Sequence, residues 1–267
     1  MSRFTPLARS LLEPMLGVSR FDLRAARLRL HEFGVRHAEL SGLLSLDDSP
    51  GSPNERLIDM LLALVARTRR ISLSALSQRN PPKLLHLWPG EHYRLLAALV
   101  QELNPRNVLE IGTFTGLSAL AMLCYLPLDA QLTTFDIVPW DKIPGTFLRS
   151  TDFASGKLNQ IVCDLKNPEN CRIHASLLRR SDLIFIDGPK DGIFEDRLLD
   201  NFASIGLQPH TLLVFDDIRI WNMLGPWRRI PYPKLDITSI GHFTGTGMVD
   251  WFPLQSQPNM LASTQSV

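Results

Sequence analysis

Short apolar segments alternate with helical segments along most of the chain after residue 89, and this alternation limits the folds that the chain can adopt. A helix is predicted from about residue 91 to residue 103, and each later apolar segment is followed by residues at helical spacing. Apolar strands that alternate with helices are typical of a parallel sheet covered on both faces. We predict strands at residues 108–111, 132–137, 159–163, 182–186, 211–215, 234–240 and 247–251.

The last two predicted strands are joined by a short connection that contains Thr244, Gly245 and Thr246. Such a connection favours an antiparallel hairpin at one edge of the sheet. The predicted fold class is therefore α/β: a doubly wound, Rossmann-like, mostly parallel seven-stranded sheet with an antiparallel C-terminal hairpin and an N-terminal helical extension.

The sequence also predicts where the parts of the chain begin and end. Residues 1–82 have helical spacing and no strand alternation, so we expect a helical extension that acts as a lid or as an oligomerisation surface, which allows a homodimer. Residues 83–255 are expected to form the α/β domain, and residues 256–267 a disordered tail.

Composition narrows the classes of partner and the compartment. The formal net charge is +1, which gives no reason to expect binding to nucleic acid or to a membrane. The three cysteines are an odd number without metal-ligand spacing, which favours a reducing compartment. The N-terminus lacks the apolar stretch of a signal peptide, so we expect a cytoplasmic location.

The most informative motif is E-x-G-x-x-x-G at residues 110–116, where a predicted strand runs into a turn and then a helix. Ligands of open α/β sheets bind at this position, beyond the carboxyl ends of the strands. A dinucleotide fingerprint would place glycines at positions 114 and 117, which are Phe114 and Leu117, so a nicotinamide cofactor is disfavoured. The alternative that Gly112 and Gly116 only form a turn stays open.

An acidic residue ends the second predicted strand. Asp136 lies 20 residues after Gly116, where a carboxylate can accept hydrogen bonds from both hydroxyls of a ribose. Asp164 follows the third strand and either contacts a nucleoside or caps the next helix. These positions indicate a nucleoside-containing ligand without identifying it.

Three more carboxylates follow the fourth and fifth predicted strands. Asp187 is followed by Lys190, and the fifth strand leads into Asp216 and Asp217. We expect these side chains to converge, because both strands end at the same edge of the sheet. Clustered carboxylates repel one another unless a cation lies among them, and oxygen ligands suit a hard ion such as Mg²⁺.

In combination, E-x-G-x-x-x-G, D-x-x-K-D at 187–191 and the Asp216–Asp217 pair resemble the class I S-adenosylmethionine (SAM)-dependent methyltransferases. The resemblance is to the metal-dependent O-methyltransferases of the catechol and caffeoyl-coenzyme A type, and it covers residues 89–252. It implies methyl transfer from SAM to a hydroxyl oxygen of a small molecule, and it makes 83–255 a SAM-binding domain. The residues that it implies for SAM are Glu110, Gly112, Thr113, Gly116, Ser118, Asp136, Asp164 and Asp187.

The same resemblance assigns the chemistry. Asp187, Asp216 and Asp217 would hold a divalent cation such as Mg²⁺, and Asp187 and Lys190 would be catalytic, with Lys190 taking the proton of the acceptor hydroxyl. A metal beside Lys190 is expected to lower the pKa of this lysine. A side chain at position 112 is expected to occupy the space of the cofactor without unfolding the chain.

The chain also departs from that family. Asparagine is usual where Asp217 stands, residues 218–223 match only loosely, and the segment 241–247 is not the expected ending. One alternative is a metal-free methyltransferase that acts on a sugar or other metabolite, with His242 or a carboxylate as base. Another is a catalytically silent nucleoside-binding module with a protein partner. Other candidates are His86 and His92 as substrate contacts, and Trp88, Trp221 and Trp227 as walls of a pocket or as packed side chains.

Overall fold

The computed structural model describes residues 55–79, 85 and 90–252. Seven strands form one sheet in the order β3-β2-β1-β4-β5-β7-β6. The strands are β1 (Asn107–Ile111), β2 (Gln131–Asp136), β3 (Leu158–Val162), β4 (Leu183–Ile186), β5 (Thr211–Asp216), β6 (Lys234–Asp236) and β7 (Thr246–Trp251).

The pairing of the strands confirms the predicted fold class. Strands β1 to β5 are parallel to their neighbours, and β7 is antiparallel to both β5 and β6. One predicted strand, 234–240, is shorter than expected and ends at Asp236. The chain turns there because the amides of Ile240 and Gly241 both donate to the carbonyl oxygen of Ile237. The connection to β7 is consequently longer than the sequence suggested.

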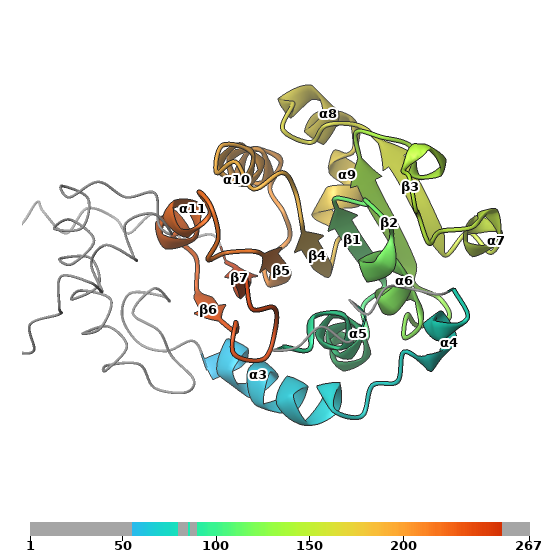
Figure 1. Ribbon diagram of the computed structural model, residues 1–267. Coiled ribbons are helices and arrows are strands. Elements are labelled where there is room, and N and C mark those ends of the chain that lie inside the picture. The colour runs from blue at the N-terminus through green and yellow to red at the C-terminus, as the bar shows by residue number, and fades with distance from the viewer. Residues whose placement is uncertain (1–54, 80–84, 86–89, 253–267) are drawn as a thin grey trace, which may run out of the picture. The chain divides into compact units, whose positions relative to one another are not determined.

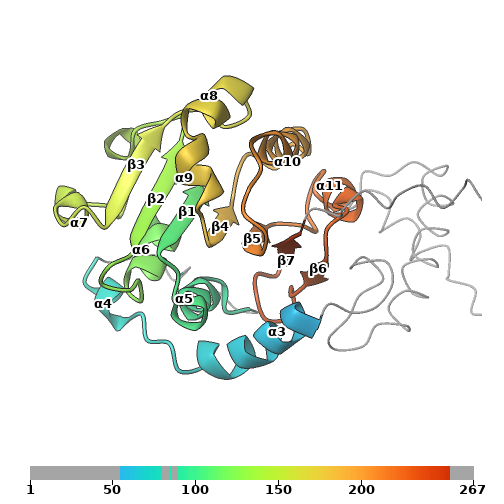
Figure 2. The same cartoon turned by 180° about the vertical axis from the view of Figure 1, so that it is seen from behind.

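Helices cover both faces of the sheet, as both views of the ribbon show (Figures 1 and 2). One face carries α8 (Pro168–Ile173), α9 (Ala175–Arg179), α10 (Phe194–Ile205) and α11 (Leu224–Arg229). The other face carries α3 (Glu55–Thr68), α5 (His92–Leu103) and α6 (Leu117–Leu123). The shorter helices are α4 (Ser74–Ser77), η2 (Trp140–Lys142) and α7 (Ser150–Phe153).

Strand alternation decides which residues enter each layer. Leu109 and Ile111 belong to the apolar cluster that includes Phe202 of α10 and Trp227 of α11, so these two residues face the α8–α11 layer. The residue between them, Glu110, therefore faces the α5–α6 layer, because neighbouring side chains on a strand point to opposite faces. By the same alternation, Asp216 at the end of β5 faces the α5 side, because its neighbour Phe215 belongs to the apolar cluster.

Helix α3 packs on the α/β domain although it lies in the predicted extension. Its apolar residues Leu57, Leu61 and Leu64 are buried, and it contacts α5, β6 and β7. Arg56 forms an ion pair with the buried Asp250 of β7. The boundary at residue 82 stays a prediction, and the predicted tail lies outside the described residues.

Within the described part of the chain, no helix has both the length and the apolar character needed to cross a bilayer.

Candidate active site at the carboxyl edge of the sheet

The strand order reverses between β1 and β4, and the candidate site lies where these two strands end. Gly112 follows β1 with a φ of +106°, and a Cβ at this position would lie 2.1 Å from the carbonyl oxygen of Asp187. Only glycine permits this approach of the two backbones. The expectation that a side chain at position 112 would occupy cofactor space is therefore wrong, because it would collide with the backbone of Asp187. A Cβ at Gly116 would likewise meet protein, the side chain of Leu148.

Glu110 is fully buried beneath the loop that follows β1. Its Oε1 accepts a hydrogen bond from Ser118 of α6, and its Oε2 has no hydrogen-bond partner among the described residues. Burial raises the pKa of Glu110 to about 8, although the bond from Ser118 favours the ionised carboxylate. An unpartnered carboxylate oxygen in this position suits a cationic ligand group.

Asp136 and Thr113 shape the same loop. The Asp136 carboxylate accepts from the amides of Thr113 (2.9 Å), Phe114 (3.0 Å) and Val138 (3.0 Å). The Thr113 hydroxyl is buried 2.7 Å from the Thr134 hydroxyl, and the Thr113 amide and carbonyl bond to Asp136 and Gly116, so its predicted contact with a cofactor stays a prediction. Asp136 keeps free lone pairs, and its predicted role toward a ribose stays a prediction.

Asp164 follows β3 and does not cap a helix. Its Oδ1 accepts from the amide of Lys166, whereas the cap of α8 is Asn167, which accepts from the amide of Glu169. The helix-cap alternative for Asp164 is therefore wrong, and its adenosine contact stays a prediction.

The predicted convergence of carboxylates is present in the structure. One carboxylate oxygen from each of Asp187, Asp216 and Asp217 lies within 4.8 Å of the other two. Lys190 lies among them, with its Nζ 2.7 Å from Asp187 Oδ1 and 3.7 Å from Asp217 Oδ2. Lys190 is 5% exposed and Asp216 is 4% exposed, so this charge cluster is largely withdrawn from water.

Two histidines complete the cluster: His242, which the sequence offered as an alternative base, and His92, which it offered as a substrate contact, although their pairing with Asp216 was not predicted. His92 Nδ1 lies 3.7 Å and His242 Nδ1 3.5 Å from the same Oδ1 of Asp216. Phe215 faces the α8–α11 layer, so Asp216 faces α5, whose first residue is His92. The sequence signal that was available is a glycine close before each histidine, at Gly90 and Gly241.

These cations change the electrostatics that the sequence suggested. Burial opposes the charged imidazolium, but the carboxylates of Asp216 and Asp217 outweigh it and raise the pKa of His242 to about 9. Burial also opposes the charge of Lys190, yet Asp187 and the other two carboxylates raise the pKa of this lysine above its ordinary value. Lys190 and His242 thus together offset much of the negative charge of the three carboxylates, whereas the sequence suggested Lys190 as the only cation there.

Further features of the cluster were also missed. Lys190 and Asp217 have φ values of +59° and +62°, a left-handed conformation that non-glycine residues rarely adopt and that often marks functional sites. Tyr93, beside His92 in α5, has its pKa raised by burial and then by the charges of Asp187 and Asp216.

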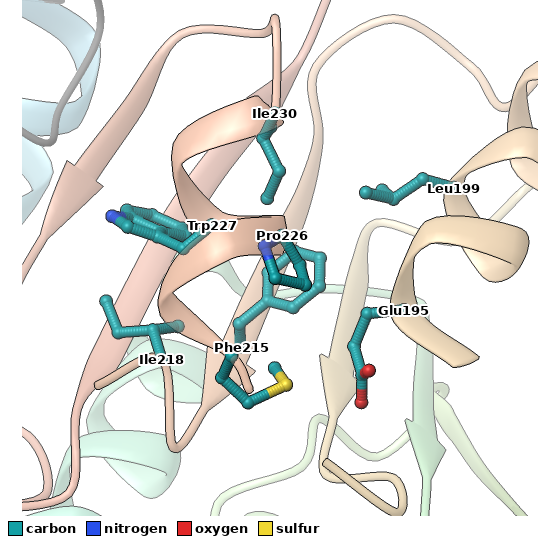
Figure 3. Close-up of a pocket in the computed structure, with 8 residues that line it drawn as sticks. Glu195, Leu199, Phe215, Ile218, Pro226, Trp227 and Ile230 are labelled. Carbon is teal, nitrogen blue, oxygen red and sulfur yellow. The ribbon is translucent and has the colours of Figure 1, made fainter. Parts of the chain in front are cut away.

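The two described candidate tryptophans differ in exposure. Trp221 is 78% exposed in the loop after β5, and Trp227 is 1% exposed. Trp227 packs against Phe215 and lines a narrow crevice between α10 and α11 that has no room for a water molecule (Figure 3). Trp227 is thus a packed core residue, whereas Trp221 is free to contact a ligand. His86 and Trp88 lie outside the described residues.

The structure is thus an α/β domain with a glycine-containing loop after β1 and a charged cluster after β4 and β5. A family model described as "O-methyltransferase" matches residues 75–221, more than half of the chain. The chain belongs to this O-methyltransferase family.

Individual relatives agree with the family model. The chain is 28% identical over 139 residues to caffeoyl-CoA O-methyltransferase 2 of Petunia hybrida, covering 48% of this chain and 52% of the relative. It is 30% identical over 143 residues to caffeoyl-CoA O-methyltransferase 2 of Eucalyptus globulus, covering 48% and 51%. The chain thus spans about half the length of these curated relatives.

A solved structure shares the fold. The SAH-bound methyltransferase PaMTH1 of Podospora anserina aligns with a TM-score of 0.50 and 18% identity, over 76% of this chain and 99% of that chain.

Proposed function

We propose that this protein transfers the methyl group of SAM to a hydroxyl oxygen of a small molecule. The observation that carries the proposal is the contact between Gly112 and the backbone of Asp187. This contact joins the loop of the cofactor motif to the cluster of carboxylates, Lys190 and histidines, so a cofactor on the loop would lie beside the charged groups. Methyl transfer depends on such positioning, because acceptor, methyl carbon and sulfur must be held in line.

The residues of the loop fit a SAM molecule. The unpartnered Oε2 of the buried Glu110 suits the ammonium group of its methionine part. The Asp136 carboxylate at the end of β2 holds the loop amides and retains lone pairs for ribose hydroxyls. SAM supplies the methyl group, and the side chains of this protein hold the cofactor and prepare the acceptor.

The acceptor is expected to be a phenol or a vicinal diol. Two apolar rings are exposed in segments that follow residues of the cluster: Trp221, in the loop after Asp217, and Phe243, which is next to His242 and 55% exposed. Exposed aromatic rings suit a flat aromatic acceptor. The relatives named as caffeoyl-CoA O-methyltransferases support the same chemical class.

Lys190 is the proposed base. A phenol with a pKa of about 10 needs to lose its proton before it attacks efficiently at neutral pH. Lys190 Nζ lies in the centre of the cluster, where it can take that proton once its own has left. The surrounding carboxylates oppose this loss, because they raise the pKa of Lys190.

A divalent cation held by Asp187, Asp216 and Asp217 forms the second part of the proposal. The buried Asp216 Oδ1 has no hydrogen-bond partner among the described residues, and three carboxylate oxygens within 4.8 Å of one another suit a hard ion such as Mg²⁺. Such an ion would stabilise an acceptor oxyanion and lower the pKa of a neighbouring lysine. The ammonium of Lys190 would have to move away from Asp187 to make room.

One observation favours a metal-free version of the same reaction. Lys190 already lies 2.7 Å from Asp187, and His242 adds a second positive charge beside Asp216 and Asp217. In that version these cations alone would stabilise the acceptor oxygen.

Methyl transfer to a panel of catechol-type acceptors, measured with and without exhaustive EDTA treatment, separates the two versions. Activity that is lost with EDTA and restored by Mg²⁺ supports the cation, and undiminished activity removes it from the mechanism. Transfer to nitrogen or carbon acceptors, with none to oxygen, would contradict the proposed reaction.

A further inference from the structure

The charged cluster contains two overlapping sets of metal ligands that share Asp216. One set is Asp187, Asp216 and Asp217, and the other is His92, Asp216 and His242; within each set the ligand atoms lie within 4.8 Å of one another. The sets differ in the chemistry of their atoms, since the first offers only oxygen and the second offers two imidazole nitrogens and one oxygen.

The two sets also differ in what already lies among them. Lys190 Nζ pairs with Asp187 Oδ1 at 2.7 Å and with Asp217 Oδ2 at 3.7 Å, so an ammonium lies within the carboxylate set. Among the described residues, no lysine or arginine forms an ion pair with the Asp216 carboxylate, and the nearest potentially cationic groups to its Oδ1 are the two imidazoles. The histidine set is therefore open to a cation without displacement of a lysine.

Distances around Asp216 fit an ion better than direct bonds. The imidazole nitrogens of His92 and His242 lie 3.7 Å and 3.5 Å from Asp216 Oδ1, longer than an ordinary N–H···O hydrogen bond of about 2.7–3.2 Å. This oxygen has no hydrogen-bond partner in the described structure, although its residue is 4% exposed. An ion with ligands at about 2.1 Å in a tetrahedral arrangement separates those ligands by about 3.4 Å. The two spacings from Asp216 Oδ1 are close to this value, and the third, between the two histidines, is within 4.8 Å.

The backbone holds the two histidines together. The amide of Glu91 donates to the carbonyl oxygens of Ile240 and Gly241, and Gly90 pairs with His242. A Cβ at Gly90 would lie 2.1 Å from the carbonyl oxygen of Gly241, so glycine at position 90 permits this approach. The start of α5 is thereby fixed against the β6–β7 connection, and the rings of His92 and His242 have centroids 4.9 Å apart.

We propose that His92, Asp216 and His242 form a binding site for a transition-metal ion that accepts imidazole, such as Zn²⁺ or Co²⁺. Two histidines and one carboxylate select these ions, whereas Mg²⁺ and Ca²⁺ prefer all-oxygen ligands. The hydroxyl of Thr244 lies 2.6 Å from His242 Nδ1 and would have to turn away for this nitrogen to bind the ion. The site concerns ion binding alone and holds whether or not methyl transfer uses the ion.

Binding of Zn²⁺, Co²⁺ and Mg²⁺ to the EDTA-treated, dialysed full-length protein tests the proposal, without SAM or acceptor. Calorimetry measures affinity, and the visible spectrum of bound Co²⁺ reports its ligands. All variants carry Cys124→Ser, because this exposed thiol is a competing ligand. We expect one equivalent of Zn²⁺ to bind at least about 100-fold more tightly than Mg²⁺.

Matched variants locate the ion. His92→Gln and His242→Gln should each weaken Zn²⁺ binding by at least about tenfold, and Asp187→Asn, which belongs only to the carboxylate set, should change it by less than about threefold. Circular dichroism confirms that each variant is folded, and the histidine ring signals in NMR spectra of the parent protein give a second readout. Tighter binding of Mg²⁺ than of Zn²⁺, equal losses in Asp187→Asn and the histidine variants, or no Zn²⁺ binding would each overturn the proposal.

Discussion

Replacement of Gly112 by alanine should destabilise the fold where strands β1 and β4 end, rather than merely block the cofactor. The added Cβ would lie 2.1 Å from the carbonyl oxygen of Asp187, about 0.9 Å inside the 3.0 Å below which Cβ atoms essentially never approach a neighbour. Strands β1 and β4 would have to separate at the point where the amide of Asp187 donates to Ile111 at 2.8 Å. The positive φ costs about 1–2 kcal/mol and the overpacking about 1–3 kcal/mol, so the expected loss is about 2–5 kcal/mol.

Urea denaturation of the variant, followed by circular dichroism, measures this loss. Gly156→Ala is a matched control, because Gly156 has a φ of +71° with nothing within 4 Å of its added Cβ. The control should lose only about 1–2 kcal/mol, the share that comes from the backbone conformation. If Gly112→Ala is as stable as Gly156→Ala and loses only SAH affinity, the close approach to Asp187 does not explain this glycine.

Three other substitutions test the charged groups. Burial raises the pKa of Glu110 from 4.5 to about 8, so the folded chain should lose at most about 5 kcal/mol of stability as the pH rises between these values. Glu110→Gln should remove this pH dependence in urea titrations, and it should also weaken SAH binding. The pKa of His242 is raised from 6.5 to about 9, so its stabilising contribution is complete below pH 6.5 and is lost as the pH rises through 9. In EDTA-treated protein, His242→Gln should abolish that loss, and a pH profile identical to that of the parent would argue against the pairing with Asp216 and Asp217. Lys190→Ala should keep SAH affinity in calorimetry but lower turnover by about 10²–10⁴-fold. The turnover should partly recover at high pH, where the acceptor ionises unaided. A reduction that is the same at every pH would contradict the role of Lys190 as base.

The sheet could be predicted from the sequence because each strand carries its own signal. Continuous apolar segments located the strands, and the rule that parallel strands end at one edge brought Asp187, Asp216 and Asp217 together. The strand at 234–240 was predicted too long, because the turn at Ile237 depends on amides that come later in the chain.

His92 and His242 were candidates from the sequence, but their meeting at Asp216 could not be predicted, because it depends on contacts between distant segments. His92 and His242 come together through the approach of Gly90 to Gly241, which no local pattern encodes. The same limit applies to Gly112, whose neighbour is the backbone of Asp187 rather than a cofactor. Glycines at functional turns can thus be located from sequence, whereas the group that each one accommodates follows only from the packed structure.

Calorimetric titration of the protein with SAM, SAH and NAD tests the central claim most directly, because the cofactor identifies the reaction. The loop after β1, with Glu110 beneath it and no glycine at position 114, predicts one-to-one binding of SAM and SAH and no detectable binding of NAD. Binding of NAD as tight as that of SAH, or no binding of SAM and SAH by the folded protein, would contradict the account.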